Sequence, residues 1–235
     1  MFAWEKNEKA EPVLAQSPSA TKTNDGDDVT VTEDLDNPFV VQEIIQKQIR
    51  KNCKKVKRII NLPKGGTDES EPSIDKDVWI YEHMRQFMLE INQFILAHKD
   101  VCTKETQPEM KISSSVLSNQ RNNEELMYLC PVFTPPQSVP AIDYMVHIHT
   151  QSTNVLNDPK LFPSRNSISK KAMKEIKTLC RRVYRIFAFS YYVHPVEFTA
   201  FEKKTHLAER FQRFLKKYDL MSSSDFLIPD EAFKA

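Results

Sequence analysis

The sequence predicts a mainly α-helical protein, and three observations lead to this fold class. The chain of 235 residues contains only three glycines, too few for the many tight turns of an all-β fold. Helix start signals precede the apolar segments, first at Asn37, a good N-cap, with Pro38 at the first helical position. One long segment keeps apolar residues at helical spacing over about four turns, namely Ile80, Met84, Phe87, Met88, Ile91 and Ile95.

The first half of the chain is expected to hold two helices. The first begins at Asn37–Pro38 and has an apolar face that ends at Ile49. A loop over 62–76 follows, and Asp75 or Asp77 then caps the core helix that carries the apolar positions given above.

The second half is expected to be helical after an irregular stretch. Residues 100–140 contain an exposed loop over 113–123 and a short strand within 125–133. Pro140 opens another helix, and a proline-containing segment breaks it. Three further helical segments follow, a long one from about Ser169 to His194, which Pro195 ends, and two shorter ones over 196–204 and 206–220.

Composition limits the class of protein. Apolar residues make up 40% of the chain, enough for one sizeable core, and no apolar run approaches the roughly 18 residues that would suggest a membrane span. Four widely separated cysteines and the lack of a signal-peptide pattern favour a reducing compartment, so we expect a cytoplasmic protein. Three glycines cannot form a glycine-rich phosphate loop.

Charge divides the chain unevenly. Residues 1–37 hold nine acidic residues and three lysines, which gives this segment a charge of −6. Because the net charge of the whole chain is +1, residues 38–235 carry a charge of +7. A polar, acidic segment with few aromatic residues cannot bury enough apolar surface to fold alone. We therefore expect a disordered acidic tail over 1–37, one domain over 38–229 and a short C-terminal tail over 230–235.

A basic run follows the first helix. It has no acidic residue and includes Lys47, Arg50, Lys51, Lys54, Lys55, Lys57, Arg58 and Lys64. One reading is a solvated helix face. The other is a surface for an acidic partner, such as a phosphorylated peptide, an anionic membrane or the chain's own tail. Nucleic acid is not expected, because no aromatic residues are interleaved with the basic ones.

No pattern indicates catalysis. His147 and His149 are two residues apart on an expected helix and point roughly 200° away from each other, so they cannot share a metal ion. The serine clusters at 113–115 and 222–224 lack the context of a nucleophile, and no acid–base pair stands out. An interaction module is therefore favoured over an enzyme.

Five segments together resemble the Mob family and are most similar to its phocein subgroup. They are "VWIYEHMRQFMLEIN", "PAIDY", "LFPSR", "CRRVYRIF" and "KYDLMS", in the family's order within residues 38–229. The resemblance implies a four-helix core with extra helices and a small hairpin. It also implies a non-enzymatic adaptor or co-activator that binds protein kinases and scaffolds, for the phocein subgroup in a striatin-containing kinase–phosphatase assembly. The alternative is a divergent structural subunit of a cytoskeletal or ciliary assembly.

The resemblance implies a zinc site with C-x4-C and H-x4-H ligand pairs. In this chain the four positions are Cys102, Gln107, Phe189 and His194. Glutamine is a poor zinc ligand and phenylalanine is none. We therefore expect that the zinc has been lost and that the chain holds no other cofactor, while a relocated site that uses His98 stays open.

The resemblance also implies a set of three basic residues that binds phosphothreonine, at Arg181, Arg182 and Arg185. At 100° per residue these lie within a wedge of about 100°, so their guanidinium groups can converge. A solvated helix face with ordinary salt bridges is the other reading. Because His194 falls on the opposite side of the helix, we expect a buried or half-buried ring there.

Overall fold

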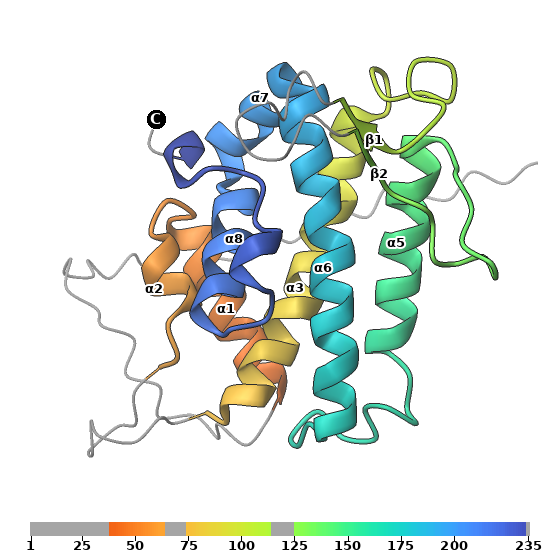
Figure 1. Ribbon diagram of the computed structural model, residues 1–235. Coiled ribbons are helices and arrows are strands. Elements are labelled where there is room, and N and C mark those ends of the chain that lie inside the picture. The colour runs from red at the N-terminus through yellow and green to blue at the C-terminus, as the bar shows by residue number, and fades with distance from the viewer. Residues whose placement is uncertain (1–37, 64–73, 114–124, 234–235) are drawn as a thin grey trace, which may run out of the picture. The chain divides into compact units, whose positions relative to one another are not determined.

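The computed structural model describes residues 38–63, 74–113 and 125–233, and the tail expected over 1–37 lies outside them. The mainly α-helical class is confirmed. None of the described helices is long and apolar enough to cross a membrane. In chain order the elements are α1 (Pro38–Lys51), α2 (Val56–Ile60), α3 (Lys76–His98), β1 (Lys111–Ile112), β2 (Leu126–Met127), α5 (Ala141–Leu156), α6 (Lys170–Val193), α7 (Pro195–Thr205) and α8 (Leu207–Lys217), with 3-10 turns at Ser223–Asp225 and Asp230–Phe233 (Figure 1).

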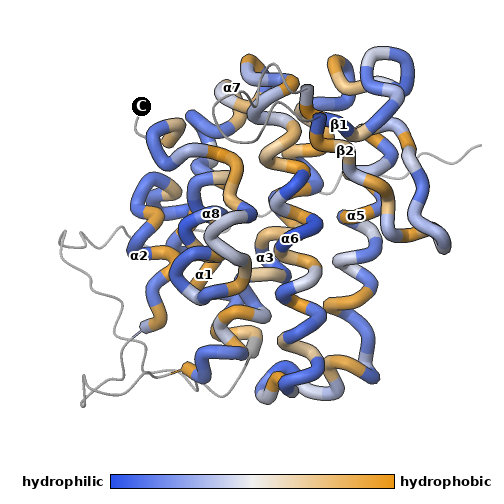
Figure 2. The backbone as a smooth tube through the Cα atoms, viewed as in Figure 1, coloured by the Kyte–Doolittle hydropathy of each residue, from blue (hydrophilic) through white to orange (hydrophobic). Residues whose placement is uncertain are grey.

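Helix α3 lies at the centre of the core and packs against α1, α5, α6, α7 and α8. Aromatic side chains fill the space between α3, α6 and α8. The ring of Phe87 lies 4.9 Å from that of Phe211, and the ring of Phe94 lies 5.0 Å from that of Phe187. All four are at most 1% exposed. Helices α5 and α6 alternate hydrophobic and hydrophilic residues along their length (Figure 2), as expected of helices with one buried face.

The expected helix starts are found where capping residues lie. Asp75, not Asp77, caps α3, and its carboxylate accepts hydrogen bonds from the backbone N–H groups of Asp77 and Val78 at 2.8 and 3.0 Å. The Ser169 hydroxyl accepts one from the N–H of Ala172 at 3.1 Å and caps α6. These bonds satisfy N–H groups that the first turn of a helix leaves without partners.

The expected strand within 125–133 is shorter in the structure. Only Leu126 and Met127 pair with β1, antiparallel, and Cys130 adds an isolated bridge to Gln137. Pro131 follows Cys130 and has no N–H for a ladder, so the strand cannot continue through it.

Helix α2 was not predicted. It lies within the basic run, where Val56, Ile59 and Ile60 are buried and Lys57 and Arg58 are exposed. The α2 helix packs against α8. The hydroxyl of Tyr218 donates to the Ile60 carbonyl at 2.6 Å, which attaches the end of α2 to the end of α8.

The arginine of "LFPSR" connects the segment between α5 and α6 to α3. The guanidinium of Arg165 donates to both carboxylate oxygens of Glu82, at 2.7 and 2.5 Å. It also lies 4.8 Å from the ring of Phe39 on α1. Glu82 is fully buried, and burial raises the pKa of its carboxyl while Arg165 opposes that shift. The motif residue is therefore a structural link.

Candidate functional site

The three arginines of the expected phosphate site lie near the middle of α6. Arg181 is exposed, and Arg182 and Arg185 are half-buried. The opposite side of the helix faces the core, since Val183 and Phe187 are 0% and 1% exposed. The amphipathic pattern of α6 therefore places the guanidinium groups on the solvent side, as expected from the sequence.

Neighbouring elements hold two of these arginines in place. Arg182 donates to the side-chain oxygen of Gln151 on α5 at 2.8 Å. The guanidinium of Arg185 lies 5.0 Å from the centre of the Tyr128 ring, directly after β2. Beneath them Tyr144 is buried, and burial raises the pKa of its hydroxyl while the charge of Arg185 opposes the shift. The site therefore combines α6, α5 and the hairpin, which the sequence did not show.

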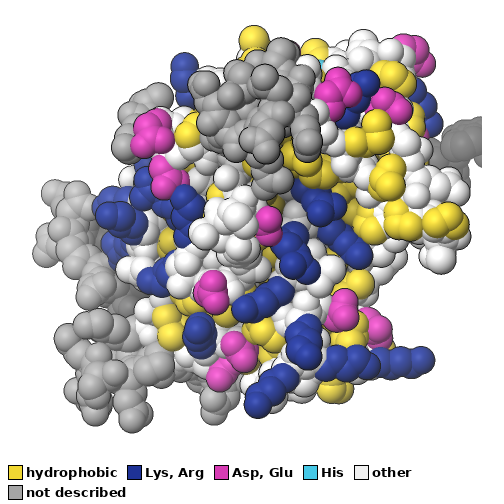
Figure 3. All heavy atoms as spheres, viewed as in Figure 1, with side chains coloured by type: hydrophobic (Ala, Val, Ile, Leu, Met, Phe, Trp, Pro, Cys, Tyr) yellow, Lys and Arg dark blue, Asp and Glu magenta, His cyan; other side chains and the backbone are white. Residues whose placement is uncertain are grey.

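Arg181, Arg182 and Arg185 have no acidic partner in the part of the chain that the structure describes, where no carboxylate forms an ion pair with any of the three. Figure 3 shows other Lys and Arg side chains gathered on the face over α6 and α8. Guanidinium groups without carboxylate partners suit an oxyanion with several acceptor oxygens.

The first pair of metal positions lies in the turn after α3. The Cys102 N–H donates to the His98 carbonyl at 2.8 Å. Its side chain is buried, and burial raises the pKa of the thiol to about 11. At the other position the Gln107 N–H donates to the Thr103 carbonyl at 3.0 Å, and its carbonyl accepts from the Ala141 N–H at 3.0 Å. The backbone of Gln107 thus connects this turn to α5.

Two threonines close the same turn, a feature that sequence reasoning missed. The Thr103 N–H donates to the Thr106 hydroxyl oxygen at 2.9 Å, and the Thr106 N–H donates to that of Thr103 at 3.2 Å. The Thr106 hydroxyl donates to the Val101 carbonyl at 2.8 Å. The spacing T-x-x-T between Cys102 and Gln107 was the available signal. These hydrogen bonds hold the turn between Cys102 and Gln107.

The second pair of metal positions lies at the end of α6. Phe189 is 0% and His194 is 8% exposed, and their rings lie 5.7 Å apart. The expectation of a buried or half-buried His194 is confirmed. Burial lowers the pKa of its imidazole. Phe189 fills interior space with an apolar ring and supplies no ligand atom.

The structure brings His98 close to His194 and Cys102. The two imidazole rings lie 6.1 Å apart, and Nδ1 of His98 is 2.8 Å from the Phe94 carbonyl oxygen. Nε2 of both histidines has no hydrogen-bond partner among the described residues. These two and Cys102 do not bring three ligand atoms within 4.8 Å of one another. The residues at the family positions therefore do not fit the closed, four-ligand zinc site.

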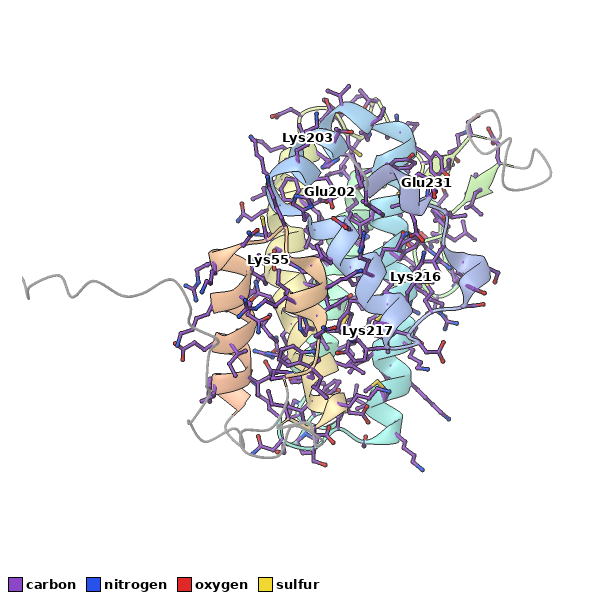
Figure 4. The ribbon with its side chains drawn as sticks, turned by 90° about the vertical axis from the view of Figure 1, so that its left-hand side faces the viewer. Lys55, Glu202, Lys203, Lys216, Lys217 and Glu231 are labelled. Atoms are coloured by element: carbon purple, nitrogen blue, oxygen red, sulfur yellow. The ribbon has the colours of Figure 1, made fainter. Side chains whose placement is uncertain are left out.

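A different group, Glu202, His206 and Glu209, does bring three such atoms within 4.8 Å in the described part of the chain. Its carboxylates already have partners. Glu202, on α7 in Figure 4, accepts hydrogen bonds from the N–H groups of Ala208 and Glu209, both at 2.9 Å. Glu209 pairs with His206 at 3.0 Å and with Arg213 at 2.7 Å. The group therefore caps the start of α8.

His147 and His149 contact different neighbours. Nδ1 of His147 is 3.6 Å from Sγ of Cys130, whereas Nε2 of His149 is 2.9 Å from the Met88 carbonyl oxygen. The two rings therefore contact different parts of the structure, and that they share no metal ion stays a prediction.

The basic run is extended by residues from elsewhere in the chain. Figure 4 shows Lys55 before α2, Lys203 on α7 and Lys216 and Lys217 on α8 on one side of the fold. Glu202 and Glu231 lie on the same side. The Lys217 ammonium donates to the side-chain oxygen of Asn61 at 2.5 Å, after α2. An acidic partner for this side stays a prediction.

Comparisons with known proteins agree with the fold and with the quoted segments. The family model described as "Mob1/phocein family" matches residues 47–228. The chain is 34% identical to MOB kinase activator-like 4 of Drosophila melanogaster and 34% identical to MOB-like protein phocein of Caenorhabditis elegans, each over 84% of this chain and 80% of the relative.

A more distant relative is the CBK1 kinase activator protein MOB2 of Candida albicans, 26% identical over 72% of this chain and 50% of the relative. The family model alone covers more than half of the chain. The chain belongs to the Mob1/phocein family.

Proposed function

We propose that this chain is a non-enzymatic adaptor for protein kinases and their scaffolds, similar to phocein, with a phosphothreonine-binding site at Arg181, Arg182 and Arg185. Family membership supports the adaptor role, and relatives bear the names kinase activator and phocein. A striatin-type scaffold is the partner that the phocein resemblance favours.

The observation that carries the phosphate site is a set of three arginines on one side of α6 with no carboxylate ion pair among the described residues. A phosphothreonine carries about two negative charges and three acceptor oxygens at neutral pH. A hydrogen bond between charged partners is worth about 1.5–3 kcal/mol. Loss of one arginine should therefore weaken binding about tenfold or more.

Two of the four thiols, those of Cys102 and Cys180, are unsuited to covalent catalysis. Burial raises the pKa of both Cys102 and Cys180, so neither is an accessible thiolate at neutral pH. A catalytic cysteine needs a lowered pKa and access to substrate. Affinity purification with mass spectrometry tests the adaptor role. Recovery of a kinase with a striatin-type scaffold would support it, and recovery of tubulin-associated proteins alone would contradict it.

The phosphate site is tested by fluorescence anisotropy with a degenerate phosphothreonine peptide library and its unphosphorylated counterpart. The wild-type chain should bind only the phosphorylated library, and the triple variant Arg181→Ala, Arg182→Ala, Arg185→Ala should lose binding while its circular dichroism is unchanged. Lys170, Lys171 and Lys174 are exposed at the start of the same helix, so their triple alanine variant is a control with the same loss of charge. Equal binding of both libraries would refute the site.

A further inference from the structure

A groove of about 350 Å³ lies between α3 and α5, and Gln42 of α1 also lines it. None of its lining residues is one of the three arginines on α6. Its volume is within the range of ligand-binding pockets in proteins. Met88 and Leu156 supply buried apolar surface, and Leu89 is 55% exposed. The groove therefore offers an apolar floor with one large aliphatic side chain open to solvent.

One end of the groove carries a positive charge. Arg85 lines it, and the only carboxylate near Arg85 among the described residues is that of Glu82, at 3.8 Å. Both oxygens of Glu82 already accept hydrogen bonds from Arg165, at 2.7 and 2.5 Å. The single negative charge of Glu82 thus lies beside the two positive charges of Arg85 and Arg165, which leaves an excess of about one positive charge. No lining residue in the described part of the chain is acidic.

Two amide side chains of the lining already use their oxygen atoms as hydrogen-bond acceptors. The side-chain oxygen of Asn157 accepts from Arg85 at 2.7 Å, and that of Gln42 accepts from Arg165 at 3.2 Å. Each of these oxygens thus has a partner, and the NH2 groups of Asn157 and Gln42 keep their donors, as does Arg85. The side chains of Asn92 and Thr153, which also line the groove, can either donate or accept. Such a lining matches a ligand rich in acceptors, such as a carboxylate next to peptide carbonyl groups.

We propose that the α3–α5 groove binds an acidic segment of a partner protein, in which a carboxylate pairs with Arg85 and a nearby aliphatic side chain packs on Leu89. An anionic lipid or a nucleic acid would need several cations for repeated phosphates, whereas the groove has one in excess. The arginine site on α6 takes no part in this binding, so the groove and the phosphothreonine-binding site can be tested independently of each other.

The test uses the full chain and pools of labelled heptapeptides that carry one Asp or Glu and one Leu or Ile, separated by one to four residues. Two matched pools replace the acid by its amide or the aliphatic residue by Ala. We expect saturable binding of the first pool in fluorescence anisotropy and at least tenfold weaker binding of the other two. Equal binding of the acidic and amide pools, or no binding of any pool, would overturn the proposal.

Two variants locate the binding. Arg85→Gln removes the charge, and Leu89→Asp removes the apolar contact and repels an acid, at a side chain exposed enough to leave the fold intact. Each should weaken binding of the first pool at least tenfold. Leu96 is on the same helix, is 49% exposed and does not line the groove, so Leu96→Asp should leave binding unchanged, as should Arg58→Gln on α2.

Three outcomes would contradict the assignment. Retained binding in both groove variants, or equal loss in Leu96→Asp, would exclude the groove. Binding seen only in a chain with Glu33→Gln, Asp34→Asn and Asp36→Asn would assign the groove to the chain's own acidic segment and not to a partner. Binding of the phosphothreonine library, measured on the same variants, should be unchanged throughout.

Discussion

Replacement of Arg165 by Ala should strongly destabilise the protein, because it leaves the buried charge of Glu82 with a weak partner. Glu82 is 0% exposed and receives two hydrogen bonds from Arg165, and the next cation, Arg85, is 3.8 Å away. Removal of one member of a buried ion pair costs about 3–5 kcal/mol. That is a large part of the roughly 5–15 kcal/mol that stabilises a typical domain.

The loss should depend on pH with a definite sign. Burial raises the pKa of the Glu82 carboxyl in the folded state, and Arg165 opposes the shift, so the variant should have a higher pKa still. Above pH 4.5 the Glu82 carboxyl of the folded variant then binds more protons than that of the unfolded chain, and the stability of the variant falls as pH rises. The variant should therefore be nearest to wild type near pH 5 and should lose stability relative to wild type toward pH 7.

Urea unfolding followed by circular dichroism at pH 5, 6 and 7 measures both effects. Arg50→Ala is the control, because Arg50 is exposed and donates only to Gln46 in the described structure. It should change the free energy of unfolding by about 0.5 kcal/mol or less at every pH. A loss below about 1 kcal/mol for Arg165→Ala, or one that does not vary with pH, would refute the link between Arg165 and a buried charge.

Three further predictions concern the metal positions and the core. Elemental analysis of the untagged protein should find no stoichiometric zinc, and one zinc per chain that disappears with Cys102→Ser would contradict this. Thr106→Val should lower the free energy of unfolding by about 1–2 kcal/mol, since it removes the hydrogen bonds that close the turn after α3. Thr106→Ser retains the hydroxyl and should keep most of the wild-type stability in the same urea assay. Burial lowers the pKa of His83 well below its usual value, so its contribution is complete above pH 6.5 and is lost as pH falls through the range below it. His83→Phe should therefore flatten the fall in stability below pH 6.5, which urea unfolding at pH 7, 6 and 5 measures.

Local signals in the sequence determined most helices of this protein. The apolar spacing of α3, the caps at Asp75 and Ser169, and the stop at Pro195 act over one or two turns, so they can be recognised without the fold. Helix α2 cannot be recognised in this way, because five residues are too short for a periodic pattern. Its stability comes from contact with α8, which only the fold provides.

The sequence also located the metal positions and the arginine trio, through motifs that match a known family. It could show that Gln107 and Phe189 are poor ligands, because ligand chemistry depends on residue type alone. It could not show that the hydroxyls of Thr103 and Thr106 close the turn between Cys102 and Gln107, because those bonds need a defined backbone.

Tertiary structure decided which charges are neutralised and which are not. Arg165 and Arg181 have the same side chain, yet Arg165 pairs with the buried Glu82, 83 residues away, and Arg181 is exposed. The groove at Arg85 combines residues from α1, α3 and α5. Ion pairing depends on distances of a few ångströms between residues far apart in the chain, so the fold alone determines where a positive charge remains for a partner.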